Sequence, residues 1–256
     1  MAYDIDGRQN DRMENYIVDN VQLLLFDLDD TLFDYDLCWE YGVKAALAKH
    51  GLTKDLEQES LYATFVKHDG ALWRQFTDGL LSLPEQRVQR FQNTLRDFGM
   101  FPSEEHAVSF QELFIELHTA YITPDMMVTN IIADLSKRFR LGIVTNGGPE
   151  QWTKVSKLEL EGYFPPETIF ASDVLGCSKP NRRIFDLALT HFNIESDCAI
   201  FVGDSWENDV VGSVEAGLRA IWLNRRNHRA STNHQPLATI HSLSELPNVI
   251  AALKPT

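Results

Sequence analysis

Short apolar runs that stop abruptly at polar residues are the strongest pattern along the chain. These runs cover residues 21–26, 140–145, 168–171, 198–202 and 219–223. A run that is this short and nearly unbroken is typical of a strand buried on both faces of a parallel sheet. We therefore predict a strand in each of these five stretches.

Amphipathic segments alternate with the predicted strands. Apolar residues recur at helical spacing over residues 126–139, from the glycines after residue 146 to about residue 160, and over residues 181–191 and 209–216. Strands that alternate with helices favour right-handed crossover units and a parallel sheet covered on both faces. The predicted fold class is α/β, with a Rossmann-like core.

The stretch from residue 35 to residue 123 has a different pattern. Its apolar residues recur at spacings of three and four, and β-branched runs are almost absent. Gly51, Gly79 and Gly99 divide it, and Pro84 and Pro102 stand where new helices can begin. We predict an all-helical insertion of four or five helices. Four apolar faces are expected in it: Trp39, Val43, Ala46 and Leu47; Leu61, Phe65, Leu72 and Phe76; Val88, Phe91, Leu95 and Phe98; and Val108, Leu113, Phe114 and Leu117.

This pattern gives a two-part organisation. Residues 17–34 and 124–256 are expected to form the α/β core, and residues 35–123 the helical insertion. Residues 1–16 are polar and are expected to be a flexible N-terminal extension. Ligands of open α/β sheets bind beyond the carboxyl ends of the strands, so those ends are the place to look for chemistry.

The first predicted strand ends in two acidic residues that face the same way. Asp27 and Asp29 are two residues apart, and in an extended segment such residues lie on one side. Neighbouring carboxylates repel each other, and a hard divalent cation such as Mg²⁺ relieves that repulsion. An acidic turn that caps a helix is the alternative, because Asp and Thr31 both serve that purpose.

Other predicted strand ends carry matching polar groups. Thr145 and Asn146 precede two glycines, and such a turn can hold phosphate oxygens at the start of a helix. Lys179 lies in a loop and can neutralise phosphate or nucleophile charge. Asp204 can supply a metal ligand, and Asp209 can orient the lysine or a metal-bound water. Taken singly, each pattern also fits an ordinary turn, a surface lysine or a capped helix.

Composition narrows the class of partner. The formal net charge of −14 disfavours nucleic-acid polymers and acidic membranes, and the short basic stretch at residues 224–229 is expected to be a solvated or substrate-facing loop. Cys38, Cys177 and Cys198 stand in no metal-binding or disulfide pattern. No apolar run reaches the roughly 20 residues that span a bilayer, and the first residues have no secretory pattern. We expect a cytoplasmic protein.

The four polar segments, in this order, resemble the haloacid dehalogenase-like (HAD) superfamily. Its first motif, Asp-x-Asp-x-Thr, is matched by residues 27–31, and its second by Thr145. Its third, a lysine often followed by proline, is matched by Lys179, and its fourth, Gly-Asp-x-x-x-x-Asp, by residues 203–209. The helical insertion resembles the C1-type cap of this superfamily. The likeness extends over nearly the whole chain from Val21 onward.

The resemblance implies a role for each matched residue. Asp27 would attack phosphorus and form an aspartyl-phosphate, while Asp29 would act as acid and then as base. Mg²⁺ would be held by Asp27, the main-chain carbonyl of Asp29 and Asp204. Thr145 and Lys179 would bind the transferred phosphoryl group. An acidic residue at position 29 is typical of phosphatases and phosphomutases in this superfamily and disfavours a dehalogenase.

The substrate is predicted less narrowly. The segments at residues 26–36, 143–147 and 220–224 look like the branch that contains bacterial pyrimidine 5'-nucleotidases, and are nearly as similar to the N-acylneuraminate-9-phosphatase branch. We expect a small phosphorylated metabolite, either a nucleoside monophosphate or a sugar phosphate. A phosphomutase shares the same motifs, whereas a non-catalytic binder would be expected to lack one of them.

Two residues of the insertion are candidates for contact with substrate. Trp73 can stack on a nucleobase, and Arg74 stands beside it. A core tryptophan next to a surface arginine is the alternative interpretation. The eight histidines form no metal-binding spacing, so none is predicted to be a metal ligand.

Overall fold

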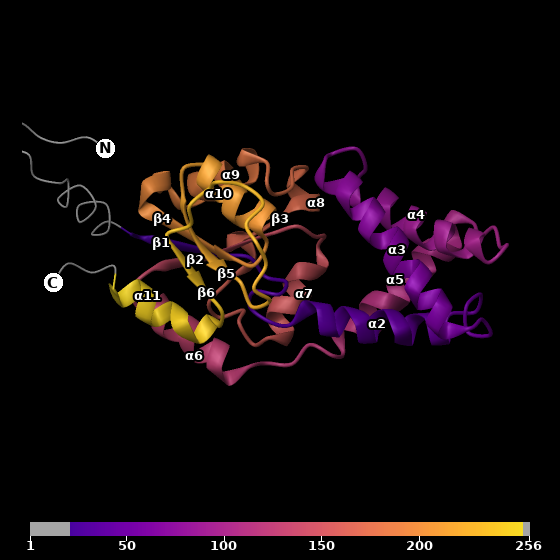
Figure 1. Cartoon of the computed structure of the whole chain (residues 1–256). Helices are drawn as coiled ribbons and strands as arrows, with labels where there is room; N and C mark the ends of the chain where they lie inside the picture. The colour runs from indigo at the N-terminus through magenta and orange to yellow at the C-terminus, as the bar shows by residue number, and fades with distance from the viewer. Residues whose placement is uncertain (1–20, 253–256) are drawn as a thin grey trace, which may run out of the picture.

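The computed structural model of the protein describes residues 21–252, and the predicted N-terminal extension at residues 1–16 lies outside this range. The described chain folds as a parallel sheet with an inserted helical bundle (Figure 1). The sheet has the strand order β3-β2-β1-β4-β5-β6, and all neighbouring strands are parallel. The strands are β1 (Leu23–Phe26), β2 (Arg140–Thr145), β3 (Ile169–Ala171), β4 (Ala199–Gly203), β5 (Arg219–Leu223) and β6 (Ala238–Ile240).

Helices cover both faces of the sheet, as predicted. They are α6 (Met126–Ser136), α7 (Glu150–Lys157), α8 (Ser172–Leu175), α9 (Arg182–Phe192), α10 (Gly212–Glu215) and α11 (Leu246–Ala252). Figure 1 shows α9 and α10 on one side of the sheet, with α6, α7 and α11 on the other. Short turns of helix are η1 (Pro166–Thr168), η2 (Ser196–Cys198), η3 (Trp206–Val211) and η4 (Leu243–Glu245). The α/β fold class is therefore confirmed.

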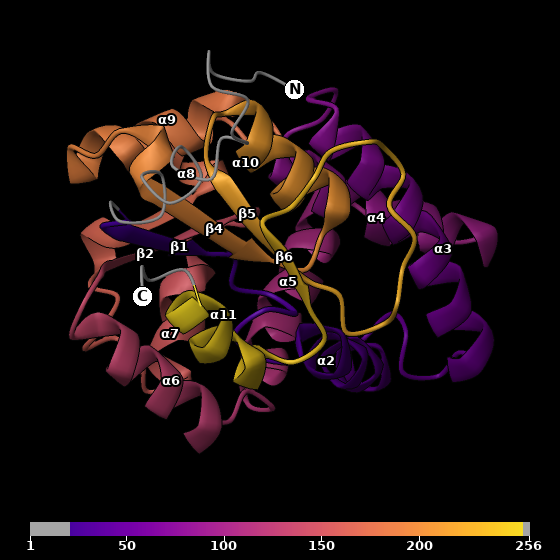
Figure 2. The same ribbon diagram turned by 60° about the vertical axis from the view of Figure 1, so that its left-hand side comes forward.

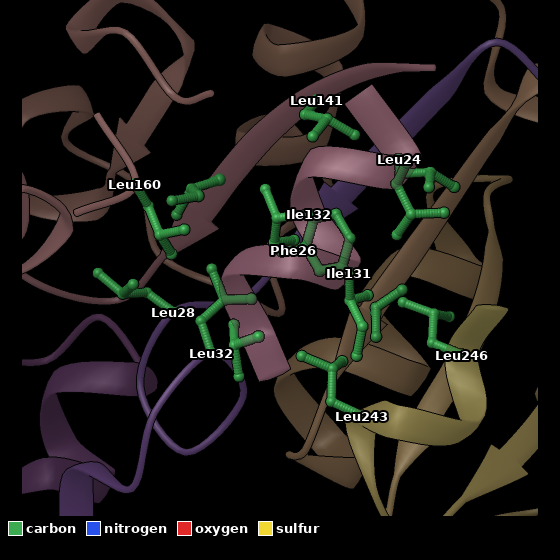
Figure 3. Packing of buried hydrophobic residues seen from close by; sticks show 14 of the residues in the cluster. Leu24, Phe26, Leu28, Leu32, Ile131, Ile132, Leu141, Leu160, Leu243 and Leu246 are labelled. Atoms are coloured by element: carbon green, nitrogen blue, oxygen red, sulfur yellow. The ribbon is translucent and has the colours of Figure 1, made fainter. Parts of the chain in front are cut away.

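Strand β1 lies in the interior of the sheet and is buried along its whole length. Leu24 and Phe26 point to one face, where they join Ile131 and Ile132 of α6 in a single apolar cluster (Figure 3). Leu25 belongs to the cluster on the opposite face, against α9. Because both faces are covered, the strand needs apolar residues at every position, which explains its unbroken run in the sequence.

The helical insertion forms a bundle of four helices with its own apolar core. The helices are α2 (Tyr35–Lys49), α3 (Gln58–Thr77), α4 (Leu83–Asp97) and α5 (Glu104–Thr119). Ser82 and Ser103 cap α4 and α5, and each accepts a hydrogen bond from the third residue of its helix. We call residues 35–119 the cap. Figures 1 and 2 show it to one side of the sheet, while the division of the chain at residues 34 and 123 remains a prediction about folding units.

The apolar face predicted for α5 is correct except for Val108. Phe114 is buried, and Leu113 and Leu117 pack against the same cluster, whereas Val108 is 45% exposed. The buried side of α5 runs through Ala107, Phe110, Phe114 and His118. A pattern based on hydropathy alone leaves out His118, because histidine is polar, and includes Val108, because valine is apolar.

Candidate active site

Three neighbouring strands carry the predicted functional residues to one edge of the sheet. Asp27 follows β1, Thr145 is the last residue of β2, and Asp204 follows β4. Because β2, β1 and β4 are parallel and adjacent, these residues meet at the carboxyl ends of the strands. They line a cavity of about 590 Å³ between the sheet and the cap, together with Asp29, Asn146, Lys179 and Asp209.

Lys179 joins two carboxylates on the floor of the cavity. Its Nζ donates to Asp27 Oδ1 at 2.6 Å and to Asp209 Oδ1 at 2.7 Å, and the lysine is only 2% exposed. Burial lowers the pKa of Lys179, but the carboxylates of Asp209 and Asp27 outweigh burial and raise that pKa above its ordinary value. The lysine is therefore a fixed positive charge beside Asp27.

Asn146 holds the loop that carries this lysine. Its Oδ1 accepts from the main-chain nitrogen of Lys179 at 2.8 Å, and its Nδ2 donates to the carbonyl of Lys179 at 2.9 Å. Both ends of the side-chain amide are thus engaged by the lysine loop. The predicted contact of Asn146 with phosphate stays a prediction, and the observed role of its side chain is to position Lys179.

Asp209 lies deeper in the core than the other acidic residues. Its Oδ2 accepts from the main-chain nitrogen of Ser205 at 2.8 Å. A Cβ at Gly203 would lie 2.4 Å from that carboxylate, so the close approach of Asp209 requires glycine there. Helix was predicted from residue 209, but a π-helical turn, η3, already begins at Trp206 and turns Asp209 inward.

The acidic cluster can hold a divalent cation. Carboxylate oxygens of Asp27, Asp204 and Asp209 lie within 4.8 Å of one another. Asp204 is half-buried, and burial together with the charges of Asp209 and Asp27 raises its pKa to about 8. Mutual repulsion of this kind favours a bound cation, and oxygen donors suit Mg²⁺. Lys179 and Ser205 engage both oxygens of Asp209, at 2.7 and 2.8 Å, whereas Thr31 Oγ1 contacts Asp27 Oδ2 only at 3.3 Å, so the carboxylates of Asp27 and Asp204 are the better ligands.

Asp29 faces the cavity beside a lysine that the sequence analysis missed. Lys154 Nζ, on α7, donates to both carboxylate oxygens of Asp29, at 2.7 and 2.6 Å. Burial raises the pKa of Asp29 to about 6, although the charge of Lys154 opposes this rise. A carboxyl group with such a pKa exchanges protons near neutral pH, which suits a general acid and base. Only the fold brings these two residues together.

Thr145 presents an unused hydrogen-bonding group. The residue is 1% exposed, and its Oγ1 has no hydrogen-bond partner within the part of the chain that the structure describes. A buried hydroxyl without a partner is costly unless a ligand completes it. Its position beside Asp27 in the cavity agrees with the predicted phosphate contact.

The two predicted contacts in the cap have different positions. Trp73 lines the cavity and packs on Phe76, with ring centroids 5.1 Å apart. Arg74 is exposed, and its Nε donates to the carbonyl of Gly70 at 3.3 Å. Because Arg74 is not among the residues lining the described cavity, the structure gives it no contact with a ligand there.

The basic stretch at residues 224–229 contacts the segment that follows β1. Arg225 donates to the carbonyl of Thr31 at 2.9 Å, and Arg226 pairs with Asp36, a cavity-lining residue, at 2.6 Å. These contacts connect the stretch to the loop after β1 and to the first turn of α2. Arg226 therefore supports a residue of the cavity wall.

Comparison with known proteins identifies the family of the chain. The family of haloacid dehalogenase-like hydrolases matches residues 24–223, which include all four motifs. The chain belongs to this family. The resemblance predicted from the motifs is therefore confirmed.

Related HAD proteins include several phosphatases. The chain is 27% identical to the pyrimidine 5'-nucleotidase YjjG of Escherichia coli, over 89% of this chain and 96% of that protein. It is 29% identical to a glyceraldehyde 3-phosphate phosphatase of Pyrococcus abyssi, over 79% and 81% of the two chains. The structure of the HAD-hydrolase YfnB of Bacillus subtilis, bound to magnesium, superposes with a TM-score of 0.79 at 23% identity, covering 91% of this chain and 99% of that one.

No helix within residues 21–252 combines the length and the apolar character needed to cross a membrane.

Proposed function

We propose that the protein is a Mg²⁺-dependent phosphatase that hydrolyses a small phosphomonoester through an aspartyl-phosphate on Asp27. One observation carries the proposal: the Asp27 carboxylate lies on the cavity floor, with its Oδ1 2.6 Å from Lys179 Nζ, beside Asp204 and the Thr145 hydroxyl, which has no hydrogen-bond partner among residues 21–252. This arrangement places a nucleophile, a fixed positive charge and a hydrogen-bond donor around one position, where a phosphoryl group fits.

In the first step, an oxygen of Asp27 attacks phosphorus and the bond from phosphorus to the leaving oxygen breaks. Lys179 and Thr145 bind the phosphoryl oxygens, and Asp29 gives its proton to the leaving oxygen. The pKa of Asp29, raised to about 6, keeps a protonated fraction available for this role. The products are an aspartyl-phosphate and an alcohol.

In the second step, water replaces Asp27 on phosphorus. Asp29, now a carboxylate, takes a proton from the attacking water, and the Asp27 to phosphorus bond breaks. Lys154 keeps the Asp29 carboxylate directed into the cavity through its two contacts. Phosphate leaves, and both aspartates return to their starting states.

Asp27 and Asp204 are the proposed Mg²⁺ ligands, and the main-chain carbonyl of Asp29 completes the set that the family resemblance implies. When bound, the cation would neutralise charge on the phosphoryl oxygens and so reduce their repulsion of the Asp27 carboxylate that attacks phosphorus. The raised pKa of Asp204 and the proximity of three carboxylates support a cation at this position.

Two classes of substrate are proposed, which differ in the leaving group. The resemblance to YjjG supports a nucleoside monophosphate, and the resemblance to the glyceraldehyde 3-phosphate phosphatase supports a short sugar phosphate. A phosphomutase would use the same floor of the cavity. It would also hold a bisphosphate, which requires a second cationic position away from Lys179.

The test is phosphate release from a panel of nucleoside monophosphates and sugar phosphates, with and without Mg²⁺. We expect turnover that requires Mg²⁺ and that Asp204→Asn reduces by on the order of 100-fold or more. Asp197→Asn, which removes a carboxylate remote from the cavity lining, is the matched control. Turnover that is equal with and without Mg²⁺ would refute the proposal.

A further inference from the structure

The cap side of the cavity is a chemically distinct half. Aromatic rings of Trp39, Tyr62, Trp73 and Phe114 form much of its wall. Aromatic walls favour flat or apolar ligand faces over a free charge. This half lies opposite Asp27 and Lys179, so it is the region that a leaving group would enter.

Polar residues of α3 and α4 are tied together within this wall. Asp69 Oδ1 accepts from Arg90 Nη1 at 2.5 Å and from Gln86 Nε2 at 3.1 Å. Arg90 Nη2 donates to Gln111 Oε1 at 2.9 Å, and its guanidinium lies 4.7 Å from the Phe65 ring centre. The arginine is 5% exposed and is therefore held in place on several sides.

Three polar atoms of this half are buried without a partner among the described residues. They are Gln86 Oε1, Arg90 Nε and His118 Nε2. Gln86, Arg90 and His118 are 1%, 5% and 2% exposed, and all three line the cavity. Gln86 can accept a hydrogen bond and Arg90 can donate one, so a ligand that offers both groups would complete them.

The positively charged side chains of the cavity are already paired with carboxylates. Each of the four lysine and arginine side chains lining the described cavity is paired with a carboxylate. Arg87 pairs with Glu150 and Arg90 with Asp69, so neither cap cation is free for an anion. Nine carboxylates line the same cavity, and two of them, Asp36 and Glu40, pair with Arg226 and Lys44 outside its lining. A second anionic group on the substrate would therefore find no unpaired lysine or arginine among the residues that line the described cavity, and would face carboxylates there.

We propose that the cap half is a subsite for an uncharged leaving group that carries both a hydrogen-bond donor and an acceptor, and that it rejects esters with a second anionic group. This inference rests on the proposed function, since it places the phosphoryl group on the opposite side, at Lys179. Such a subsite favours phosphate esters of nucleosides or uncharged sugars, and it disfavours bisphosphates and phosphorylated carboxylic acids. A bisphosphate intermediate of a phosphomutase belongs to the disfavoured class.

Binding to the Mg²⁺-loaded Asp27→Asn protein tests the subsite without turnover. Titration calorimetry would compare two pairs that differ by one carboxylate: uridine and orotidine 5'-monophosphates, and glycerol 3-phosphate and 3-phosphoglycerate. In at least one pair, we expect the ester without the carboxylate to bind, and to bind at least about tenfold more tightly than the ester that carries it. Equal or tighter binding of the anionic members, or no binding by either neutral ester, overturns the inference.

Second variants on the Asp27→Asn background locate the effect. Asp69→Asn frees Arg90 from its carboxylate, so it is expected to reduce the discrimination at least about threefold. Glu40→Gln removes a half-exposed carboxylate from the same cavity and is also expected to reduce the discrimination. This variant keeps the test valid if Asp69→Asn fails to fold. Asp97→Asn, on the exposed pair with His68 outside the cavity lining, is the matched control and should leave the ratio unchanged. An equal reduction in all three variants would contradict the proposed location.

A separate readout distinguishes failure of the proposed function. Release of nitrophenol from p-nitrophenyl phosphate by the wild-type enzyme tests the catalytic floor, because this ester is highly reactive and makes little demand on the leaving-group subsite. Absence of that activity, with the binding preference intact, would refute the phosphatase proposal and leave the subsite standing. Activity without the binding preference would refute the subsite alone.

Discussion

Lys154 is the residue that fixes Asp29 in the cavity. Its ammonium contacts both oxygens of the carboxylate, and it lies 4.1 Å from the centre of the Tyr35 ring. The lysine is 2% exposed. A buried charge pair with this geometry restricts the carboxylate to one orientation, which general acid and base catalysis requires.

Replacement of Lys154 by methionine should therefore lower kcat by about tenfold or more, with a smaller change in KM. Methionine keeps most of the stem that packs on Tyr35 but leaves the Asp29 carboxyl group without its positioning contact. Steady-state kinetics on the preferred ester provide the measurement. Lys157→Met is the control on the same helix, because Lys157 is exposed. Equal kcat in the two variants would contradict the positioning role.

Among single residues, the sequence predicts those that directly follow a strand, and it misses those that a distant helix brings into the site. Asp27 and Thr145 stand at the ends of apolar runs, so the local pattern reveals them. Lys154 stands 125 positions from Asp29 on an amphipathic helix, and nothing local separates it from a surface lysine. The same reason explains why Arg74 was proposed next to Trp73: a helix turns neighbours about 100° apart, and only one of the two faces the cavity.

Helices α2 and α5 approach each other closely at Gly42. A Cβ built on Gly42 would lie 2.6 Å from the Cβ of His118 and 2.8 Å from its Cα. Such distances are far inside van der Waals contact, and main-chain atoms cannot give way as a side chain can. The crossing therefore depends on the absence of a side chain at residue 42.

Gly42→Ala is expected to lower the free energy of unfolding by about 1–3 kcal/mol. Denaturant unfolding followed by circular dichroism measures it. Gly70→Ala is the matched control in α3, where an added Cβ meets nothing within 4 Å, and it should raise that free energy by about 0.5–1 kcal/mol. A loss of stability in the control as large as that of Gly42→Ala would show that helix propensity and packing at Gly42 had been misjudged.

Elements with strong periodicity were predictable, and short ones were not. The strands β1, β2 and β5 were predicted close to their observed bounds, and the four helices of the cap fall within the predicted number of four or five. Strand β6 (Ala238–Ile240) was missed because the exposed Thr239 interrupts its apolar run, whereas the equally short β3 is apolar and buried throughout. The turn η3 was missed because a π-helical turn has no sequence pattern of its own. Helix α6 ends at Ser136, three residues before the predicted end, because Arg140 already begins a strand.

The cap and the core are joined across the cavity by an ion pair. Arg87 of α4 contacts the Glu150 carboxylate at the start of α7. Burial raises the pKa of Glu150, but the charge and hydrogen bond of Arg87, a main-chain hydrogen bond and the charge of Lys154 together hold that pKa below its ordinary value. A contact of this kind favours the arrangement in which the cap covers the site, and covering excludes water during chemistry.

Arg87→Met is expected to weaken that arrangement and to raise KM by roughly three- to tenfold, with a smaller effect on kcat. The comparison variant is Arg96→Met, on the same helix but with an exposed side chain. Initial rates over a range of substrate concentrations distinguish the two parameters. If both variants show the wild-type KM, the ion pair does not govern closure.

The account as a whole depends on Asp27 as a covalent nucleophile, and one measurement tests this most directly. The wild-type protein would be mixed with substrate and Mg²⁺, quenched in acid within milliseconds, and digested for peptide mass spectrometry. We predict a transient phosphoryl group on the peptide that contains Asp27, absent when Mg²⁺ is withheld and absent from Asp27→Asn, which should release no phosphate while keeping its fold. Phosphate release by a folded Asp27→Asn at the wild-type rate, with no phosphoryl group on that peptide, would contradict it.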